Sequence, residues 1–209
     1  MEMKRQKRTY NLVKRAESVR ETRQAILDAA AECFAAKGIR QTSMQEVART
    51  ADVSAGTVAN HFPRRDELVE ATLAHIGASL PFPRWEDLAS LADPRARLLG
   101  LVKPLYEYYQ AGDRWVHILF TERDSVPAVG RRGDAALARI DELISRALGP
   151  AARDEKLVRA VQAVLHPSFR QSLLAKGASN KLALDTASDT IGALLDKAQT
   201  RQREAVRSA

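Results

Sequence analysis

Polar side chains recur at helical spacing in the short stretch TADVSAGTVANHF, which runs from Thr50 to Phe62. Its candidate chemical groups are a hydroxyl, an amide and an imidazole, those of Thr57, Asn60 and His61. In a helix that begins after Ser54 they lie opposite Val58 and Phe62, an i, i+4 pair that can face a core. Such groups donate and accept hydrogen bonds, as contacts with base edges in the DNA major groove require.

Two further residues of this stretch suit a phosphate group. Gly56 has no side chain, so another molecule can approach the backbone closely, and Ser54 is an N-cap at a helix start that presents free amide groups. Pro63 ends the helix after Phe62. Because any surface helix carries polar residues, a solvated helix without a ligand is the alternative interpretation of this stretch alone.

The neighbouring helices must position this stretch. Apolar residues at 26, 29, 30, 33 and 34 predict a helix over about 18–37, and Gly38 follows its C-terminus. Ser43 and Glu46 form a capping box for a second helix that ends near Thr50. Two short helices joined by a tight turn, with a preceding helix to pack against, form the helix-turn-helix arrangement.

A resemblance to a known family covers about residues 20–75, which include ILDAAAECFAAKGIRQTSMQEVARTADVSAGTVANHFPRRDELVEATL. The segment resembles the DNA-binding region of TetR-type transcriptional regulators. The matching positions are Ala29, Ala30, Phe34, Gly38, Thr42, Ser43, Val47, Ala48, Ala51, Val53, Ser54, Gly56, Thr57, His61, Phe62, Arg65 and Leu68. The resemblance implies a homodimer in which each helical head reads half of a double-stranded DNA operator, and a helical body that binds an inducer and forms the dimer interface.

Three positions depart from the pattern of that family. Ala59 stands where the family usually has a Tyr that helps to anchor the DNA backbone, and Ala55 where it usually has Lys or a similar polar residue. Asp52 replaces the usual turn Gly, and Asp tolerates left-handed backbone better than most residues. The residues expected to contact DNA are Arg20, Thr42, Ser43, Gln45, Ser54, Gly56, Thr57, Asn60, His61 and Arg65.

The N-terminus is strongly basic in a chain whose formal net charge is +7. We expect a flexible basic arm over residues 1–17, which can hold phosphates or enter a minor groove and so compensate for Ala59. A positive excess suggests a polyanionic partner, although it also serves simple solubility.

The rest of the chain is also predicted to be helical, because no segment alternates with period two. The Pro-rich LPFPRW stretch suggests a boundary between a DNA-binding domain with its connecting helix, 18–80, and a ligand-binding and dimerisation domain, 81–209. Pro104 and Pro167 are expected to kink or split their helices. The later helices are expected near 64–80, 94–110, 113–123, 133–148, 153–176 and 180–204.

Aromatic and imidazole side chains gather in the body. They predict an apolar ligand pocket with a few orienting polar groups, and a plain hydrophobic core is the alternative. The candidate ligand-binding residues are Tyr106, Tyr109, Trp115, His117, Phe120, His166 and Phe169.

Two apolar stripes near the C-terminus are predicted to form a four-helix dimer interface with a second subunit, since one stripe would suffice for packing on the body. Their residues are Leu157, Val161, Val164, Leu184, Ile191, Leu194 and Leu195.

The sequence lacks features that other classes of protein need, among them the converging acid, base or nucleophile of an enzyme. It has no signal-peptide pattern, no apolar run of about 18 residues, no second cysteine for a disulfide with Cys33, and no metal or nucleotide motif. We therefore expect a soluble cytoplasmic protein without membrane association, cofactor, metal or enzymatic activity. The predicted function is a repressor released from its operator by a small apolar or aromatic inducer. The alternative is a DNA-organising or protein-sensing protein with no small-molecule inducer.

Overall fold

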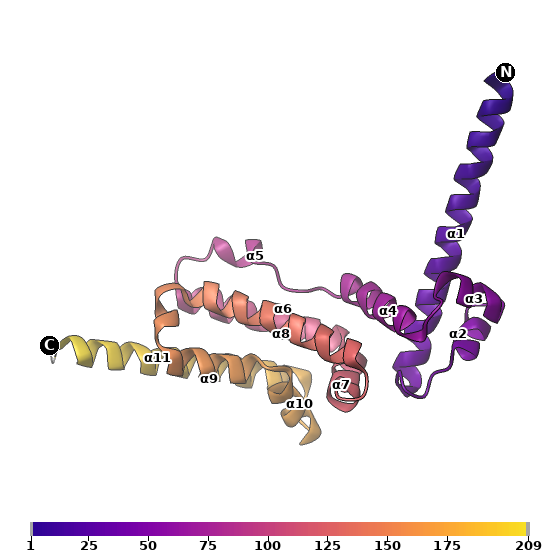
Figure 1. Ribbon diagram of the computed structural model, residues 1–209. Coiled ribbons are helices and arrows are strands. Elements are labelled where there is room, and N and C mark those ends of the chain that lie inside the picture. The colour runs from indigo at the N-terminus through magenta and orange to yellow at the C-terminus, as the bar shows by residue number, and fades with distance from the viewer. Residues whose placement is uncertain (1, 208–209) are drawn as a thin grey trace. The chain divides into compact units, whose positions relative to one another are not determined.

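The computed structural model describes the backbone of residues 2–207 and the side chains of residues 14–201, 203, 204 and 207. Every regular element in this part of the chain is a helix, which confirms the predicted all-α fold (Figure 1). In chain order the elements are α1 (Glu2–Lys37), α2 (Met44–Thr50), α3 (Ala55–His61), α4 (Arg65–Ser79), α5 (Glu86–Ala89), α6 (Pro94–Ala111), α7 (Asp113–Glu122), α8 (Pro127–Leu148), a 3-10 turn (Gly149–Arg153), α9 (Glu155–Leu165), α10 (Pro167–Ala175) and α11 (Asn180–Arg207).

The chain packs as two compact units. The first comprises Met1–Ser79 together with His117–Arg132, and the second comprises Leu80–Val116 together with Gly133–Ala209. The expected division into 18–80 and 81–209 cuts the chain once, whereas the chain crosses between the units three times. Residues 117–132 therefore belong with the N-terminal helices, although they come from the later part of the sequence.

Helix α1 begins earlier than the sequence analysis predicted. It starts at Glu2, whereas the pattern of apolar residues suggested a start near residue 18 after a flexible arm over 1–17. No Gly or Pro interrupts residues 2–37, and Lys, Arg, Glu and Gln are good helix formers, so no local signal stops the helix. The basic side chains at positions 4, 5, 7 and 8 lie outside the described part.

The core of the first unit joins its short helices to α1 and α4. It is built from apolar side chains that are almost entirely buried: Ile26, Ala30 and Phe34 of α1, Val47 of α2, Val58 of α3, Phe62, and Leu68, Val69 and Ile76 of α4. Since α2 and α3 have only seven residues each, too few to be stable alone, their position depends on this core.

The core of the second unit lies among four long helices. Its buried members include Leu98, Leu101 and Leu105 of α6, Ile144 and Leu148 of α8, Leu157 and Val161 of α9, and Ala187 and Ile191 of α11. The predicted split at Pro167 is observed: α9 ends at Leu165, His166 caps the next helix, and α10 begins at Pro167. Pro104 lies within α6, which continues through it.

The Pro-rich stretch after α4 is ordered by aromatic contacts in the second unit. The Phe82 ring meets the Tyr108 ring edge-on at 5.1 Å. Two arginines of α8 cover this stretch: the Arg139 guanidinium lies 3.8 Å from the Phe82 ring centre and the Arg146 guanidinium 4.4 Å from the Trp85 ring centre. Such cation–π contacts hold an extended segment without sheet or helix hydrogen bonds.

The residues of the predicted dimer stripes lie largely within the core of their own chain. Leu157, Val161, Val164, Ile191 and Leu195 are buried in the core of their own chain, and Leu184 and Leu194 are half-buried against that core. The five buried side chains are covered by helices of the same chain, whereas Leu184 and Leu194 keep part of their surface exposed. Within the described residues, no helix is long and apolar enough to cross a membrane.

Candidate nucleic-acid interface

Helix α2 is fixed at its start by the predicted capping box. The Ser43 hydroxyl accepts the Glu46 N–H at 3.2 Å, and the Glu46 carboxylate accepts the Ser43 N–H at 3.0 Å. Lys37, the last residue of α1, donates to the same carboxylate. The Lys37 bond first, and then the bonds from Ser43, lower the pKa of Glu46 from 4.5 to about 2. The end of α1 and the start of α2 are therefore joined through one charged side chain.

This pKa shift predicts the acid stability of the head. The folded pKa of Glu46 lies below its ordinary value, so its stabilising contribution is present above about pH 4.5 and is lost as pH falls toward about 2. We expect the melting temperature of the Glu46→Gln variant to fall less steeply than that of the wild type across this range. Circular dichroism melts at a series of pH values measure it, with Glu21→Gln on the exposed side of α1 as the control. Parallel curves for wild type and Glu46→Gln would contradict the assignment.

Helix α3 is held at both ends. Asp52 has a φ of 53°, so it takes the left-handed conformation expected of the turn residue. At the start of the helix Ser54 accepts the Thr57 N–H at 3.0 Å, as its predicted N-cap role requires. At the end Arg23 of α1 donates to the His61 carbonyl oxygen at 3.3 Å and lies 4.2 Å from the Phe62 ring centre.

The inner and outer sides of α3 follow the predicted pattern. Val58 and Phe62 are 0% and 1% exposed and anchor the helix on the core. Gly56 and Asn60 are exposed, whereas Thr57 and His61 are half-buried at the border of the outer face. Ser54 and Thr57 pair through their hydroxyl groups at 2.9 Å. The outer face thus presents an amide, an imidazole and two hydroxyls on one short, rigid helix.

Gly56 is not required by the packing of the head. A Cβ atom at this position would meet only the Ser54 hydroxyl, at 3.6 Å, which is ordinary van der Waals contact. Its φ is not in the left-handed region, since the positive-φ glycines of the described chain are Gly38, Gly149 and Gly177. A glycine in a helix without a structural reason keeps the backbone accessible to another molecule.

Gly56→Ala therefore separates stability from recognition. Alanine favours the helix, so we expect an unfolding free energy unchanged or raised by up to about 1 kcal/mol. If the backbone at Gly56 lies against a phosphate, the added methyl group weakens DNA binding at the same time. Urea unfolding and DNA titration of one preparation measure both quantities. If Gly56→Ala binds DNA as tightly as the wild type, no phosphate lies close to the backbone at Gly56.

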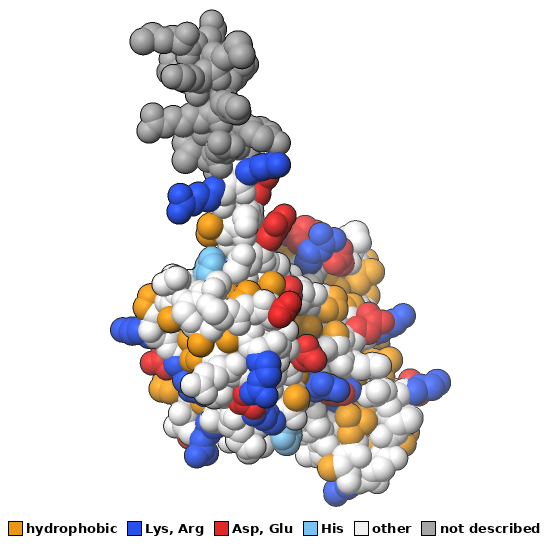
Figure 2. Space-filling model, turned by 90° about the vertical axis from the view of Figure 1, so that its right-hand side faces the viewer, with side chains coloured by type: hydrophobic (Ala, Val, Ile, Leu, Met, Phe, Trp, Pro, Cys, Tyr) orange, Lys and Arg blue, Asp and Glu red, His pale blue; other side chains and the backbone are white. Residues whose placement is uncertain are grey.

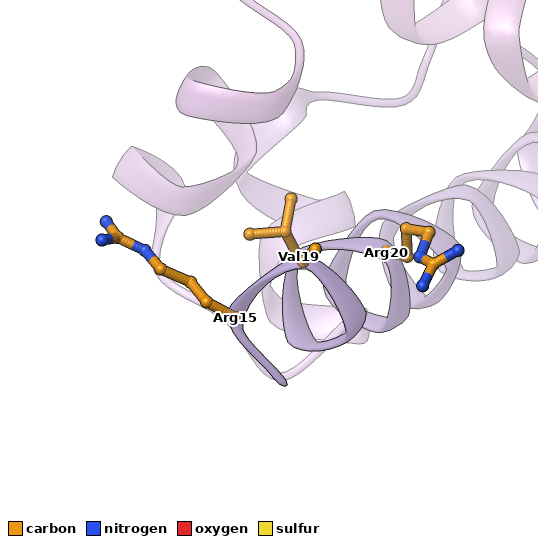
Figure 3. A pocket seen from close by; sticks show the side chains of 4 residues that line it. Arg15, Val19 and Arg20 are labelled. Atoms are coloured by element: carbon orange, nitrogen blue, oxygen red, sulfur yellow. The ribbon is translucent and has the colours of Figure 1, made fainter. Parts of the chain in front are cut away.

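Arg20 and its neighbours form a shallow depression on α1. Arg15, Ala16, Val19 and Arg20 line it, and Figure 3 shows the two guanidinium groups extending in opposite directions from the helix. Ser43 and Gln45 at the start of α2 are also exposed. These positions leave the predicted polar contacts of α1 and α2 accessible.

Thr42 and Arg65 have structural partners that the sequence analysis did not anticipate. Thr42 is 4% exposed and its hydroxyl donates to the Gly38 carbonyl oxygen at 2.8 Å, so the side chain of this predicted DNA-binding residue lies inside the head. The Arg65 guanidinium donates to the carbonyl oxygens of Ile39 and Thr42 and fixes the loop before α2.

Charged side chains are scattered individually over the face of the molecule drawn in Figure 2. Lys and Arg side chains alternate there with Asp and Glu, and they do not merge into one basic patch. On this face, individually placed side chains rather than bulk positive charge are the groups that can contact DNA.

Residues from 117–132 complete the first unit, and the sequence analysis missed them. The Glu122 carboxylate accepts the Arg40 N–H at 3.1 Å and lies against Gly38, where an added Cβ atom would come within 2.1 Å of it. Arg131 of α8 pairs with Glu70 of α4. Since the residues of each pair are more than 60 positions apart, no local sequence pattern predicts these contacts.

The predicted ligand-binding residues are divided between the two units. Tyr106 and Tyr109 are buried in the second unit, and Trp115, His166 and Phe169 are half-buried there. His117 and Phe120 are exposed residues of the first unit. Tyr109 donates to the Leu165 carbonyl oxygen at 2.7 Å, which also gives this ring a structural role.

A helical head of this kind defines a helix-turn-helix protein, and comparison with known proteins agrees. Residues 26–72 match the model of a family described as bacterial regulatory proteins, tetR family. The repressor KstR2 of Mycobacterium tuberculosis is 33% identical over 93 residues, which are 44% of this chain and 46% of KstR2. Matches to such curated relatives cover between 29% and 48% of their lengths.

Solved structures extend the similarity beyond the head. A TetR-family transcriptional regulator from Rhodococcus sp. superimposes with a TM-score of 0.65 at 25% identity, over 83% of this chain and 98% of that one. The multidrug-binding protein EbrR, solved with proflavin, gives a TM-score of 0.55 at 26% identity, over 83% of this chain and 99% of that one. Residues 26–72 therefore carry the helix-turn-helix region of TetR-family transcriptional regulators, and the remaining helices match solved structures of such regulators in fold.

Proposed function

We propose that the protein is a sequence-specific DNA-binding repressor that acts as a homodimer and is released from its operator by a small molecule. The observation that carries the proposal is the outer face of α3, where Asn60 is exposed on a helix anchored by Val58 and Phe62. Regulators of this family are not enzymes, so the chemistry expected of the head is recognition.

The proposed contacts divide into two kinds. Asn60 and His61 reach base edges, because an amide and an imidazole can both donate and accept. Ser54, the backbone at Gly56, Gln45, Ser43 and Arg20 hold phosphates and set the position of α3 in the groove. The pairing of the Ser54 and Thr57 hydroxyls uses one of their two protons and leaves the other free to be donated to a phosphate oxygen.

The dimer is proposed to form through the outward sides of α9 and α11, since their inward sides are occupied. Ala163 and Ala193 are exposed there, and Leu182 is 54% exposed. Small side chains allow two helices to approach closely, and a two-fold axis would make the contact self-complementary. Two heads then read half-sites separated by about 34–36 Å or a multiple of that distance.

The inducer is proposed to bind in the second unit. Proflavin binding by EbrR and the aromatic cluster of α6 both favour a flat, largely apolar compound. Helix α7 is proposed to transmit inducer binding to the DNA-binding helices, because its residues 113–116 belong to the second unit and its residues 117–122 to the first. Glu122, at the far end of α7, bonds the loop that precedes α2.

Selection of bound duplexes from a random pool tests the proposal. The full chain should enrich an inverted repeat, bind it with two chains per duplex, and lose affinity steeply with salt, with about 0.9 in the log-log slope for each phosphate neutralised. Enrichment of a single half-site bound by one chain would contradict the dimer. Enrichment that no flat aromatic compound reverses would favour the alternative without an inducer.

A further inference from the structure

A polar cluster with a buried arginine at its centre lies in the second unit, where α7, α10 and α11 contribute its hydrogen-bonding residues. Arg170 of α10 is 1% exposed. Its guanidinium donates to the Asp113 carboxylate, with Nη2 to Oδ2 at 3.2 Å, and to the Asn180 Oδ1 at 2.7 Å. Gln171 donates to the same carboxylate at 3.4 Å. Arg170 is therefore a positive charge fixed among buried residues that are otherwise apolar in the described part of this unit.

The hydroxyl of Tyr106 belongs to the same neighbourhood and has no hydrogen-bond partner among the described residues. Tyr106 is 5% exposed and its ring lies beside that of Tyr109, with centres 6.2 Å apart. Burial raises the pKa of Tyr106 to about 12, and the charge of Arg170 partly offsets the rise. Leaving a buried hydroxyl unpaired is costly, which is why nearly all such groups have a partner.

The charges around the Tyr106 hydroxyl determine which kind of ligand atom can form a hydrogen bond with it. The counterion of Arg170 is Asp113, whose side chain is 45% exposed and so is partly screened by solvent, whereas Arg170 is not. The pair has no net charge, but its positive member is the buried one, and it is the charge of Arg170 that acts on the Tyr106 hydroxyl. An oxygen that accepts a hydrogen bond is favoured there, and a cation is disfavoured.

We propose that Tyr106 and Arg170 form the polar end of the inducer site and bind the carboxylate or carbonyl oxygen of an aromatic molecule. The Tyr106 hydroxyl donates to that oxygen and Arg170 attracts its charge. The half-buried ring of Phe169, which packs against the same core as Tyr106, supplies apolar surface. This inference rests on the proposed regulator function and specifies the ligand class.

Tyr106→Phe tests the inference in the full-length protein with three probes: 2-naphthoate, 2-methylnaphthalene and the cation proflavin. We expect 2-naphthoate to bind the wild type and to lose about ten- to hundredfold in affinity in Tyr106→Phe, because a hydrogen bond to a charged group is lost. Affinity for 2-methylnaphthalene and proflavin should change less than twofold. Tyr108→Phe, on the same helix, is the matched control and should bind 2-naphthoate as the wild type does.

Equal binding of 2-naphthoate by Tyr106→Phe and wild type would overturn the inference, as would a selective loss of proflavin binding. A Tyr106→Phe variant that is only more stable, with unaltered binding, would mean that the hydroxyl has no ligand role. Failure of 2-naphthoate to bind the wild type, in a protein that still binds its selected duplex, would overturn the ligand class and leave the DNA-binding function standing. Binding of 2-naphthoate without loss of DNA affinity would support the site and contradict its regulatory role.

Discussion

Replacing Ile191 by Glu is expected to unfold the second unit and not merely to separate two subunits. Ile191 is 0% exposed within a single chain and packs in the core shared by α6, α9 and α11. The substitution removes a large apolar side chain from a packed site and places a carboxylate there. The combined cost exceeds about 4 kcal/mol, a large part of the roughly 5–15 kcal/mol that stabilises a typical domain.

Ala193 supplies the matched control for Ile191. It lies two positions further along α11 and is exposed, on the side proposed to meet a second subunit. Ala193→Glu should keep the helical content of the wild type and weaken the dimer. Far-ultraviolet circular dichroism with analytical ultracentrifugation distinguishes the two outcomes. A folded monomer from Ile191→Glu would mean that Ile191 lies at a subunit interface after all, and a folded dimer from Ala193→Glu would place the interface elsewhere.

Asn60→Ala is expected to weaken binding of the selected duplex without affecting folding. Asn60 is exposed in the middle of the outer face of α3, where its amide can pair with a base edge. Loss of a good base contact costs about 1–3 kcal/mol, or about five- to 150-fold in affinity. Because a base contact carries sequence information, the preference at one position of the half-site should also relax.

The control for Asn60→Ala is Gln199→Ala, which removes an exposed amide from α11 in the second unit. Fluorescence anisotropy titrations at one fixed salt concentration measure both variants on the selected duplex and on single-base changes of it. Gln199→Ala should match the wild type throughout. Full affinity and an unchanged base preference in Asn60→Ala would show that the Asn60 side chain does not contact a base.

Local signals in the sequence were sufficient to predict the short helices α2 and α3 and the turn between them. Ser43 and Glu46 define the start of α2, Ser54 the start of α3 and Pro63 its end, because caps and proline act on residues within one helical turn. Asp52 takes the left-handed turn conformation that its type tolerates. The same kind of signal placed the break before Pro167.

Partners distant in the sequence could not be predicted in this way. The stripe that contains Ile191 shows that α11 has an apolar side, but helical periodicity does not say whether its own chain or a second chain covers that side. The burial of Thr42 depends on a bend at Gly38, and the contact of Glu122 with Arg40 brings residue 122 to residue 40. The sequence analysis did not single out Arg170, because its partner, Asp113, lies 57 positions away.

The ratio of two affinities tests the central claim most directly. The full chain is titrated against the duplex enriched from a random pool and against a scrambled duplex of the same length and composition, at one physiological salt concentration. A sequence-specific regulator should bind the enriched duplex about a thousandfold or more tightly than the scrambled one. Equal affinity for the two duplexes would show that the protein reads only the phosphate backbone, and it would contradict the proposed role of α3.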